Sequence, residues 1–513
     1  MADASLIAPA LGSQAPDPSL EGLDISKWTT VAVSNDFAAR AMSLYFSTDH
    51  PLLCPFDRKL FTEDLISANQ GSYCSRALVN ALMYWCCLAY ESIDRGSIYV
   101  VDLFRKEAEH LTEGNPNSPT PLDAATEMFL SLGYLMQGRD GMILHHLSNA
   151  SSIGRQLGLF GIPEDVAQAA LDRMTPDELR AAAYPAWGVF NWTVLMHLFY
   201  RQEGGLYPKY PPIVPAPTGE SKVAEDNEND EGSLNETSTG LASKALDSQV
   251  IFASLCHFWT IVHEVAAVYY GNQTAAGGDP PSLQFAEFKF RELLTWADGL
   301  PRVLTRSQND SDLVLIMHLW LHSAVLDIFR PFRQARSKAT PKVKLRTFSA
   351  FDSTPDAAYN ASVRQLKHLI VTYRSTHASS NYTIIWQTAL LYTGSAMLRS
   401  ADDDRLEYFL ICLRSFQSLR RSFRVTEVLA KALLSKAIQQ ADISTSLASK
   451  ILDDLRTTAP AGEEAATSGG LIRAPFKANL DVEGMDSEYT MEQLAGQFEE
   501  SIWIERYTNI FYN

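Results

Sequence analysis

The chain has 513 residues, of which 46% are hydrophobic and 20% are charged, a composition typical of a folded globular protein rather than a disordered one. Its formal net charge of −17 and its pI near 5.1 exclude attachment to nucleic acid through overall charge, so any DNA contact needs a local basic module. The length allows one large domain or two ordinary ones.

The chain is predicted to begin with a disordered leader over residues 1–35. This stretch is rich in Ala, Pro, Ser and Asp, and it has no basic region followed by a long apolar core, so it does not resemble a signal peptide. An N-terminal helical lobe is predicted next, at residues 36–218. It contains an apolar helix at 72–92 and an amphipathic helix at 97–111.

The stretch 119–160 has the pattern of a helical hairpin. Thr120, Pro121 and Asp123 form a helix start with a hydroxyl N-cap, a proline at the first helical position and a carboxylate near the positive helix end. A helical repeat of apolar residues follows, and a polar turn at 138–141 separates it from a second amphipathic run. Nothing in the hairpin indicates catalysis.

An uncharged stretch at 181–200 has about the length that spans a bilayer. It contains a proline, an asparagine and His197, and a capping box at 175–178 starts the helix well before the apolar run. We therefore expect a buried central helix rather than a membrane span, and no membrane partner.

Residues 219–242 are predicted to be a disordered acidic insertion, because they offer almost no large apolar side chain for burial. The alternative is an acidic activation segment. Such segments interleave bulky apolar residues with the acids, and residues 219–240 have only Val223 and Leu234. A C-terminal helical lobe follows at 243–456, with its clearest helical period at 312–330. Its other predicted helices include those at 355–376 and 426–455, and one at 284–299 whose apolar side is formed by Phe285, Phe288, Leu293, Leu294 and Trp296.

A flexible linker is predicted at 457–490, and an amphipathic segment at 491–513. The segment sets four acidic residues among many apolar ones, which suits either a helix docked on the bundle or a short activation or partner-binding helix. Its high apolar content favours docking. No strand pattern competes with the helical ones. The predicted fold class is all-α: a large two-lobed helical bundle with a disordered acidic insertion.

The titratable residues do not indicate a catalytic, cofactor or metal site. His318 and His322 lie four residues apart, a spacing that can hold a metal, but no glutamate or third ligand completes the pattern. The sequence has neither a nucleophile elbow nor a phosphate-binding glycine loop. The cysteines form no C-x-x-C pair and mostly lie in apolar helical runs, as free thiols do in a reducing compartment. They are Cys54, Cys74, Cys86, Cys87, Cys256 and Cys412. We expect a protein that is not an enzyme.

The strongest polar feature is RPFRQARSKATPKVKLR at residues 330–346, which contains no acid and which we call the basic segment. Its basic residues are Arg330, Arg333, Arg336, Lys338, Lys342, Lys344 and Arg346. Such a run can serve as a nuclear import signal or a nucleic-acid patch, or it can be a solvated loop between helices. It has no recognition helix or aromatic stacking platform, which disfavours a role in reading DNA bases.

Four stretches, in this order, resemble the regulatory domain of fungal binuclear zinc-cluster transcription factors, often called the middle homology region. They are CSRALVNALMYWCCLAY at 74–90, the hairpin at 119–160, ELRAAAYPAWGVFNWTVLMHLFYRQEGGLYPKYPPIVPAP at 178–217, and LIMHLWLHSAVLDIFRPF at 315–332. The DNA-binding module of that family needs six closely spaced cysteines sharing two zinc ions. This sequence has no such cluster, so we expect no zinc cofactor.

The resemblance implies transcriptional regulation in the nucleus, by a domain that senses a signal or binds a partner. The expected partners are other transcription regulators or a second copy of the chain, and a small-molecule effector. DNA would be contacted through a partner, through a missing exon or not at all. The expected effector site lies between the tryptophan-bearing helices, around Trp187, Trp192, Trp259 and Trp320. Two alternatives remain: a helical enzyme or ligand-binding protein built on this scaffold, or an interaction module that modulates full-length relatives.

Overall fold

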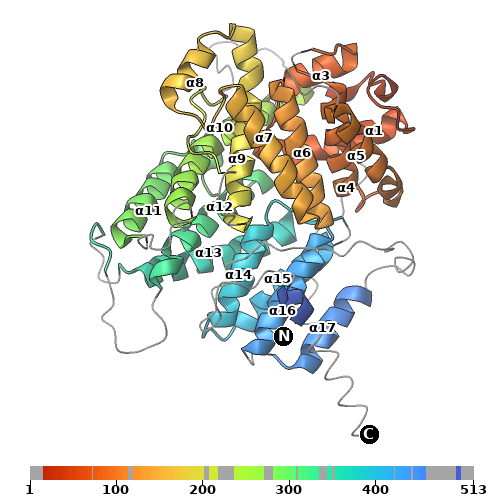
Figure 1. Cartoon of the computed structure of the whole chain (residues 1–513). Coiled ribbons are helices and arrows are strands. Elements are labelled where there is room, and N and C mark those ends of the chain that lie inside the picture. Colours follow the sequence, from red (N-terminus) through yellow and green to blue (C-terminus); the bar gives the residue numbers. More distant parts are fainter. Residues whose placement is uncertain are drawn as a thin grey trace.

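A computed structural model describes residues 15–71, 73–113, 119–200, 207–217, 236–270, 281–307, 310–333, 344–348, 353–420, 422–440, 443–457 and 493–497. Across these ranges the regular elements are helices and no strand is formed, which confirms the predicted all-α class (Figure 1). The α-helices are α1 (Asn35–Thr48), α2 (His50–Leu53), α3 (Arg58–Ser67), α4 (Arg76–Tyr90), α5 (Ile98–Glu113), α6 (Pro121–Gln137), α7 (Asp140–Gln156), α8 (Glu164–Leu171), α9 (Pro176–Tyr200), α10 (Glu236–Tyr270), α11 (Leu283–Asp298), α12 (Asp312–Phe329), α13 (Pro355–Thr376), α14 (Gln387–Arg399), α15 (Arg405–Leu419), α16 (Val425–Gln439) and α17 (Thr445–Thr457). The short 3-10 helices are η1 (Pro18–Leu20), η2 (Ile25–Lys27), η3 (Arg95–Ser97), η4 (Arg302–Leu304), η5 (Arg330–Phe332) and η6 (Ala378–Asn381).

The expectation of a disordered leader over residues 1–35 is wrong where the structure describes that stretch. Residues 15–34 form η1 and η2, and the side chain of Trp28 is buried together with three neighbouring apolar side chains. The Trp28 indole N–H donates a hydrogen bond to the carbonyl of Leu65 at 2.9 Å. Burial of the large Trp28 ring offsets the conformational entropy that is lost when this stretch becomes ordered. The overall composition of the stretch does not reveal this contribution. Residues 1–14 lie outside the described residues.

The α6–α7 hairpin matches the predicted pattern. The backbone N–H of Thr120 donates to the Asp123 carboxylate at 2.7 Å, as expected of a capping box. Gly138 ends α6 in the left-handed conformation with a φ of 67°, which a glycine adopts without steric cost. The hairpin packs against α4 and α9 (Figure 1).

Two predicted boundaries in the C-terminal half differ from the structure. Helix α10 begins at Glu236, so the end of the predicted acidic insertion is helical, and residues 219–235 lie outside the described part of the chain. The continuous helix expected at 426–455 is divided into α16 and α17. A separate helix starts after Ser444, because the Ser444 hydroxyl acts as an N-cap and accepts the backbone N–H of Leu447 at 3.1 Å.

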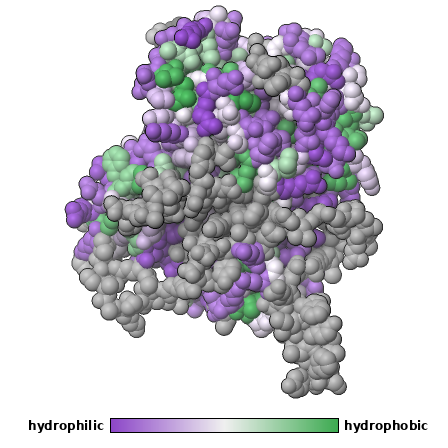
Figure 2. All heavy atoms as spheres, viewed as in Figure 1, coloured by the Kyte–Doolittle hydropathy of each residue, from purple (hydrophilic) through white to green (hydrophobic). Residues whose placement is uncertain are grey.

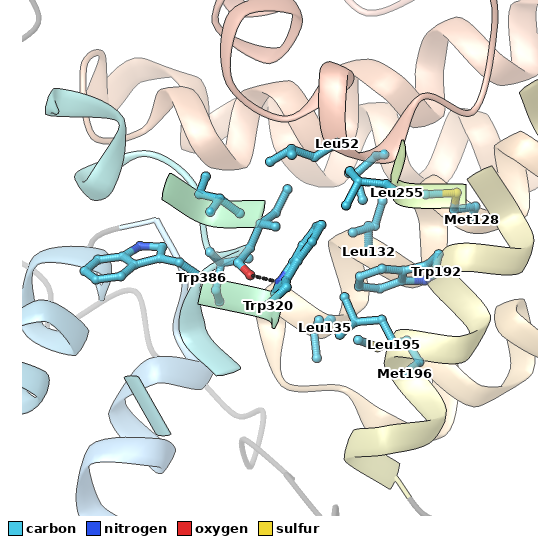
Figure 3. Packing of buried hydrophobic residues seen from close by; sticks show 14 of the residues in the cluster. Leu52, Met128, Leu132, Leu135, Trp192, Leu195, Met196, Leu255, Trp320 and Trp386 are labelled. Carbon is cyan, nitrogen blue, oxygen red and sulfur yellow. Dashed lines mark hydrogen bonds between the residues drawn. The ribbon is translucent and has the colours of Figure 1, made fainter. Parts of the chain in front are cut away.

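Buried side chains from both predicted lobes belong to one hydrophobic cluster, whose members range from Leu20 to Ala495. Helix α10 packs against α2 and α9 and also against α11 and α12. In the same cluster, Trp192 of α9 lies beside Leu132 and Leu135 of α6 (Figure 3). Whether the chain divides into two lobes stays a prediction, and so does the linker at 457–490, nearly all of which is outside the described ranges.

Two helical stretches are long and apolar enough to cross a membrane by length and composition alone, Ser248–Tyr269 and Asp312–Phe332. In the structure 61% and 83% of their apolar windows are buried, as in core helices of a folded domain. The stretch 181–200 lies in α9, and its described side chains are buried apart from that of Leu198, which is partly exposed.

All six cysteines are free thiols with buried side chains. Burial raises the pKa of each thiol, for Cys412 to about 12, because the thiolate is disfavoured away from water. This agrees with cysteine packing as a small hydrophobic residue.

Candidate functional site

The basic segment begins with an arginine that is built into the core. The guanidinium of Arg330 pairs with Asp327 at 2.9 Å and lies over the ring of Tyr392, 4.8 Å from its centroid. The Tyr392 hydroxyl donates to the same carboxylate at 2.8 Å, and Arg330 is only 8% exposed. A buried cation held in this way supports the fold and is poorly placed to meet a receptor or a phosphate.

Arg333 is also engaged in packing. Its guanidinium stands 3.9 Å from the ring centroid of Tyr359 and 3.6 Å from the Asp356 carboxylate. Both partners belong to α13, so Arg333 joins the end of α12 to the next helix. Stacking on an aromatic face is a role that arginine fills better than lysine.

The far end of the basic segment is exposed. Lys344 and Arg346 have exposed side chains, and the backbone N–H of Arg346 donates to the Glu287 carboxylate at 3.0 Å, which holds this end of the segment against α11. Arg336, Lys338 and Lys342 lie outside the described residues. The seven basic residues look alike in the sequence, but two of them, Arg330 and Arg333, have structural roles.

The four tryptophans expected to line an effector groove are core residues. The indole N–H of Trp187 donates to the carbonyl of Val214 at 2.8 Å. The Trp320 indole N–H donates a hydrogen bond, drawn dashed in Figure 3, to the carbonyl of Ile385 at 3.2 Å. The Trp320 ring packs against that of Trp259 with centroids 5.1 Å apart. Trp192, the fourth, is likewise buried.

His318 and His322 are also satisfied without a metal. His318 Nε2 lies 3.2 Å from the carbonyl of Leu304, and His322 Nδ1 lies 3.3 Å from the hydroxyl of Ser362. Burial lowers the pKa of His322 to about 3, so it is neutral at physiological pH. Within the described ranges, no group of three or more His, Cys, Asp or Glu side chains could hold a metal ion.

An open groove of about 780 Å³ lies between α10 and α11, and we call it the α10–α11 groove. None of the four predicted tryptophans lines it. Helix α10 contributes Gln249, Val250, Ala253, Ser254, His257 and Ile261. Helix α11 contributes Phe288, Arg291, Glu292, Thr295 and Trp296, and the chain beyond it contributes Gly299, Leu300 and Pro301. The volume is within the range of small-molecule sites.

The floor of the groove is apolar and fixed. Ile261, Trp296 and Leu300 are buried, and the Trp296 indole N–H donates to the backbone carbonyl of Ser254 at 2.9 Å, which holds the ring in place. Phe288 stands at the rim with 51% of its surface exposed. Figure 2 shows apolar residues interrupting the mostly hydrophilic surface on the side of the molecule that carries α11.

The two charged side chains of α11 that line the groove differ in their partners. Glu292 accepts a hydrogen bond from Lys289 Nζ at 2.6 Å, and Lys289, only 2% exposed, also pairs with Glu264. Arg291 is exposed, and no acidic side chain in the described part of the chain lies within 4.0 Å of it. Lys289 is thus shared by two carboxylates, and the charge of Arg291 acts on the nearby Glu287 carboxylate, so the charges around this wall leave no positive excess.

The residues of the groove are evident in the sequence, but their arrangement is not. The sequence pattern places Phe285, Phe288, Leu293, Leu294 and Trp296 on one apolar side of a helix. In the structure Leu293 and Trp296 are buried, Phe285 is partly buried, and Phe288 and Leu294 are exposed. A signal was present, since Leu294 and Trp296 are two positions apart and so point to opposite sides of a helix. Which side faces the core depends on α10, which periodicity cannot place.

The chain is similar to fungal transcription regulators. It is 24% identical over 395 residues to the notoamide biosynthesis transcriptional activator of Aspergillus versicolor, covering 73% of this chain and 59% of that protein. It is 24% identical over 349 residues to the nitrogen assimilation transcription factor nirA of Emericella nidulans, covering 64% and 37%. The factor nit-4 of Neurospora crassa is 23% identical over 350 residues, covering 63% and 30%.

The aligned part therefore spans about a third to three fifths of each relative's length. No family model matches the chain, and no solved structure matches it. None of the three relatives is named as an enzyme.

Proposed function

We propose that this chain is the regulatory portion of a transcription regulator of the fungal zinc-cluster type, acting in the nucleus and without enzymatic activity. The observation that carries the proposal is the similarity to a fungal transcriptional activator over 73% of the chain. The all-α architecture and the capped hairpin expected of such a regulatory domain support it.

Contact with DNA is proposed to be indirect. The overall charge of −17 repels phosphates. The proposed partners are other transcription regulators or a second copy of this chain, and another regulator would carry the DNA-binding module.

A reporter assay tests the regulatory role. The full chain is joined to an unrelated DNA-binding domain, and reporter expression is measured against that domain alone. We expect a change of at least threefold, in either direction. The same fusion with Trp320→Ala, which removes a buried ring, serves as the unfolded control. Expression equal to that of the DNA-binding domain alone, at equal protein level, would contradict the proposal.

A salt titration tests whether DNA contact is indirect. The purified chain is mixed with non-specific duplex DNA at decreasing salt, and we expect no binding even at the lowest concentration. Binding with a steep dependence on salt would instead show that several phosphates are neutralised, and would point to the basic segment as the contact surface.

The exposed end of the basic segment is proposed to act in nuclear import. Lys344 and Arg346 are changed to alanine in a fluorescent fusion of the full chain, and the nuclear-to-cytoplasmic ratio is measured. We expect the ratio to fall at least twofold. A matched change of two exposed cations elsewhere, Arg95 and Lys106, should leave it unaltered. If both variants behave alike, the segment is a solvated loop.

A further inference from the structure

We infer that the outer face of α5 docks a second copy of this chain, whose own α5 lies across it in the antiparallel direction. The inference rests on the proposed function, where a second copy is one of the partners, and it names the surface and the orientation. It stands on the exposed apolar side chains of α5 and on the order of the charges along that helix.

Helix α5 leaves one apolar face uncovered. It packs on α4, and its inner side buries Val101, Phe104 and Ala108. On the outer side Tyr99 is 83% exposed and Leu103 is 49% exposed. Residues four positions apart are neighbours on a helix surface, so these two side chains form one apolar patch. Tyr99 is also the most exposed large apolar residue in the described part of the chain, and a partner that covers it removes this surface from water.

Several charges of this face are not neutralised by the chain itself. Arg95, which lies in η3 directly before α5, is exposed, and so are Lys106 and Glu113 of α5. None of these three has an ion-pair partner in the described ranges. Asp94, the N-cap of η3, accepts the backbone N–H of Gly96 at 2.8 Å and keeps its negative charge at the edge of the face.

The middle of α5 carries one more negative charge. Asp102 pairs with Arg105 at 3.2 Å, and Arg105 also pairs with Glu109 at 2.7 Å. One guanidinium thus serves two carboxylates, and this group of three keeps an excess negative charge. The face therefore presents positive and negative charges that nearly balance, although the chain as a whole is strongly acidic.

The order of these charges is complementary to itself when one copy is reversed. Asp102 and Lys106 lie two positions on either side of position 104, and Arg95 and Glu113 lie nine positions on either side. In an antiparallel pair centred there, Asp102 of each copy faces Lys106 of the other, and Arg95 faces Glu113. A parallel pair would place each charge opposite the same charge. The charge order therefore favours a second copy in the antiparallel direction.

The apolar patch supplies the affinity and the charges supply the direction. Leu103 lies one position from the centre, so the two copies of Leu103 meet there, with Tyr99 beside them. Exposed ion pairs contribute little affinity each, but they disfavour the wrong orientation. One helix face buries less than the roughly 800 Å² per partner of a standard interface. We therefore expect a reversible dimer with a Kd of about 10–100 μM.

The test is sedimentation velocity of the purified full chain from about 5 to about 200 μM, a range that brackets this Kd. The dimer fraction should rise with concentration. Tyr99→Ala and Leu103→Ala should each weaken dimerisation at least fivefold, because each removes apolar surface from the centre of the interface. The matched control is Val303→Ala in η4, outside this face. Val303 is 62% exposed, and its loss should leave the dimer unchanged.

A charge exchange tests the orientation. Asp102→Lys and Lys106→Asp each place like charges opposite one another across the two-fold axis, so each variant alone should dimerise at least fivefold more weakly. An equimolar mixture of the two variants should recover the dimer, because the added lysine of one chain then faces the added aspartate of the other. Circular dichroism confirms that both variants are folded.

Three outcomes would overturn the inference. They are a chain that stays monomeric throughout the range, a dimer that Tyr99→Ala and Leu103→Ala leave unaltered, and a mixture of charge variants that does not recover. The first also removes the second copy as a partner, and the second assigns self-association to another surface. Because association is measured without a reporter, each of these results can occur while the regulatory role holds.

Discussion

Asp49 is a fully buried carboxyl group where segments from both halves of the chain meet. It lies between α1 and α2, and it accepts the indole N–H of Trp85 in α4 at 3.0 Å. Thr383, which precedes α14, also contributes a hydrogen bond that favours the charged carboxylate. Burial outweighs these hydrogen bonds and raises the pKa of Asp49 from 3.8 to about 7.

This carboxyl makes stability depend on pH. An acid with a higher pKa in the folded than in the unfolded state holds its proton more tightly when folded, so stability falls as pH rises from about 4 to 7 and levels off above. We expect Asp49→Asn to lose this slope, whereas Asp403→Asn, at an exposed site, should keep it. Denaturant unfolding at pH 5, 6, 7 and 8 measures both. Parallel pH profiles for Asp49→Asn and the unmodified chain would show that Asp49 does not carry the effect.

The two ends of the basic segment should respond differently to the loss of charge. Arg330→Ala leaves the Asp327 carboxylate buried and unpaired, so we expect a loss of about 3–5 kcal/mol in the free energy of unfolding. Arg346→Ala removes an exposed side chain and should cost less than about 0.5 kcal/mol. Equilibrium unfolding of both variants tests this. Similar small losses would place Arg330 at the solvated surface.

Residue roles could be predicted where local rules set them. The Thr120 cap and the Gly138 helix end follow from steric and hydrogen-bonding preferences within a few positions. The distinction between Arg330 and Arg346 could not be predicted, because it depends on Tyr392, which is distant in sequence.

At the scale of elements, α9 approaches the corner after α2 so closely that only glycine fits at the contact. A Cβ atom at Gly188 would stand 2.8 Å from the carbonyl oxygen of Leu53 and 2.8 Å from Cα of Pro55. Both of these atoms belong to the backbone, which cannot rotate away. The contact therefore fixes the distance between α9 and the chain at the end of α2.

We expect Gly188→Ala to lower the free energy of unfolding by about 1–3 kcal/mol, because an added methyl group overpacks the contact. The matched control is Gly141→Ala in α7, where nothing lies within 4 Å of the added Cβ and alanine should be neutral or stabilising by up to about 1 kcal/mol. Thermal unfolding compares the two. An unaltered midpoint for Gly188→Ala would mean that the helices can separate at little cost.

The bounds of a helix could be predicted where capping residues and prolines mark its ends in the sequence. Helix α13 begins at Pro355 after its N-cap residue Thr354, and its bounds of 355–376 are those predicted. The leader was predicted wrongly because Trp28 is fixed by distant partners. Its carbonyl accepts the amide of Asn80 in α4 at 3.0 Å, a contact that composition cannot reveal.

At the scale of the molecule, residues just before α16 contact residues in and just after α4. The ring of Phe423, just before α16, lies 6.4 Å from that of Trp85 in α4, and the hydroxyls of Ser92 and Ser422 are hydrogen bonded. Together with Asp49, these contacts join segments more than 300 positions apart.

We therefore expect the full chain to unfold in one cooperative transition, and residues 36–218 alone to lack a stable fold. Denaturant curves followed by tryptophan fluorescence and by circular dichroism should coincide for the full chain. Phe423→Ala should shift both curves together, with a loss of about 3–5 kcal/mol. Two separated transitions would instead support two independent lobes.

The α10–α11 groove is a feature of the whole molecule that the sequence alone does not predict. The aromatic and basic residues of α11 were visible in the sequence, but a groove is a relation between two helices. Its position depends on how α10 packs between α9 and α12, which no local pattern encodes.

Because every cysteine is buried, the reaction of these thiols with a reagent can report when the structure opens. A thiol reagent added to the native protein meets no accessible thiolate, so modification waits for a local or global opening that exposes one. Cys86 and Cys87 in α4 would report the N-terminal half, and Cys412 in α15 the C-terminal half. The order in which these thiols react would show which part of the bundle opens first, without a single substitution.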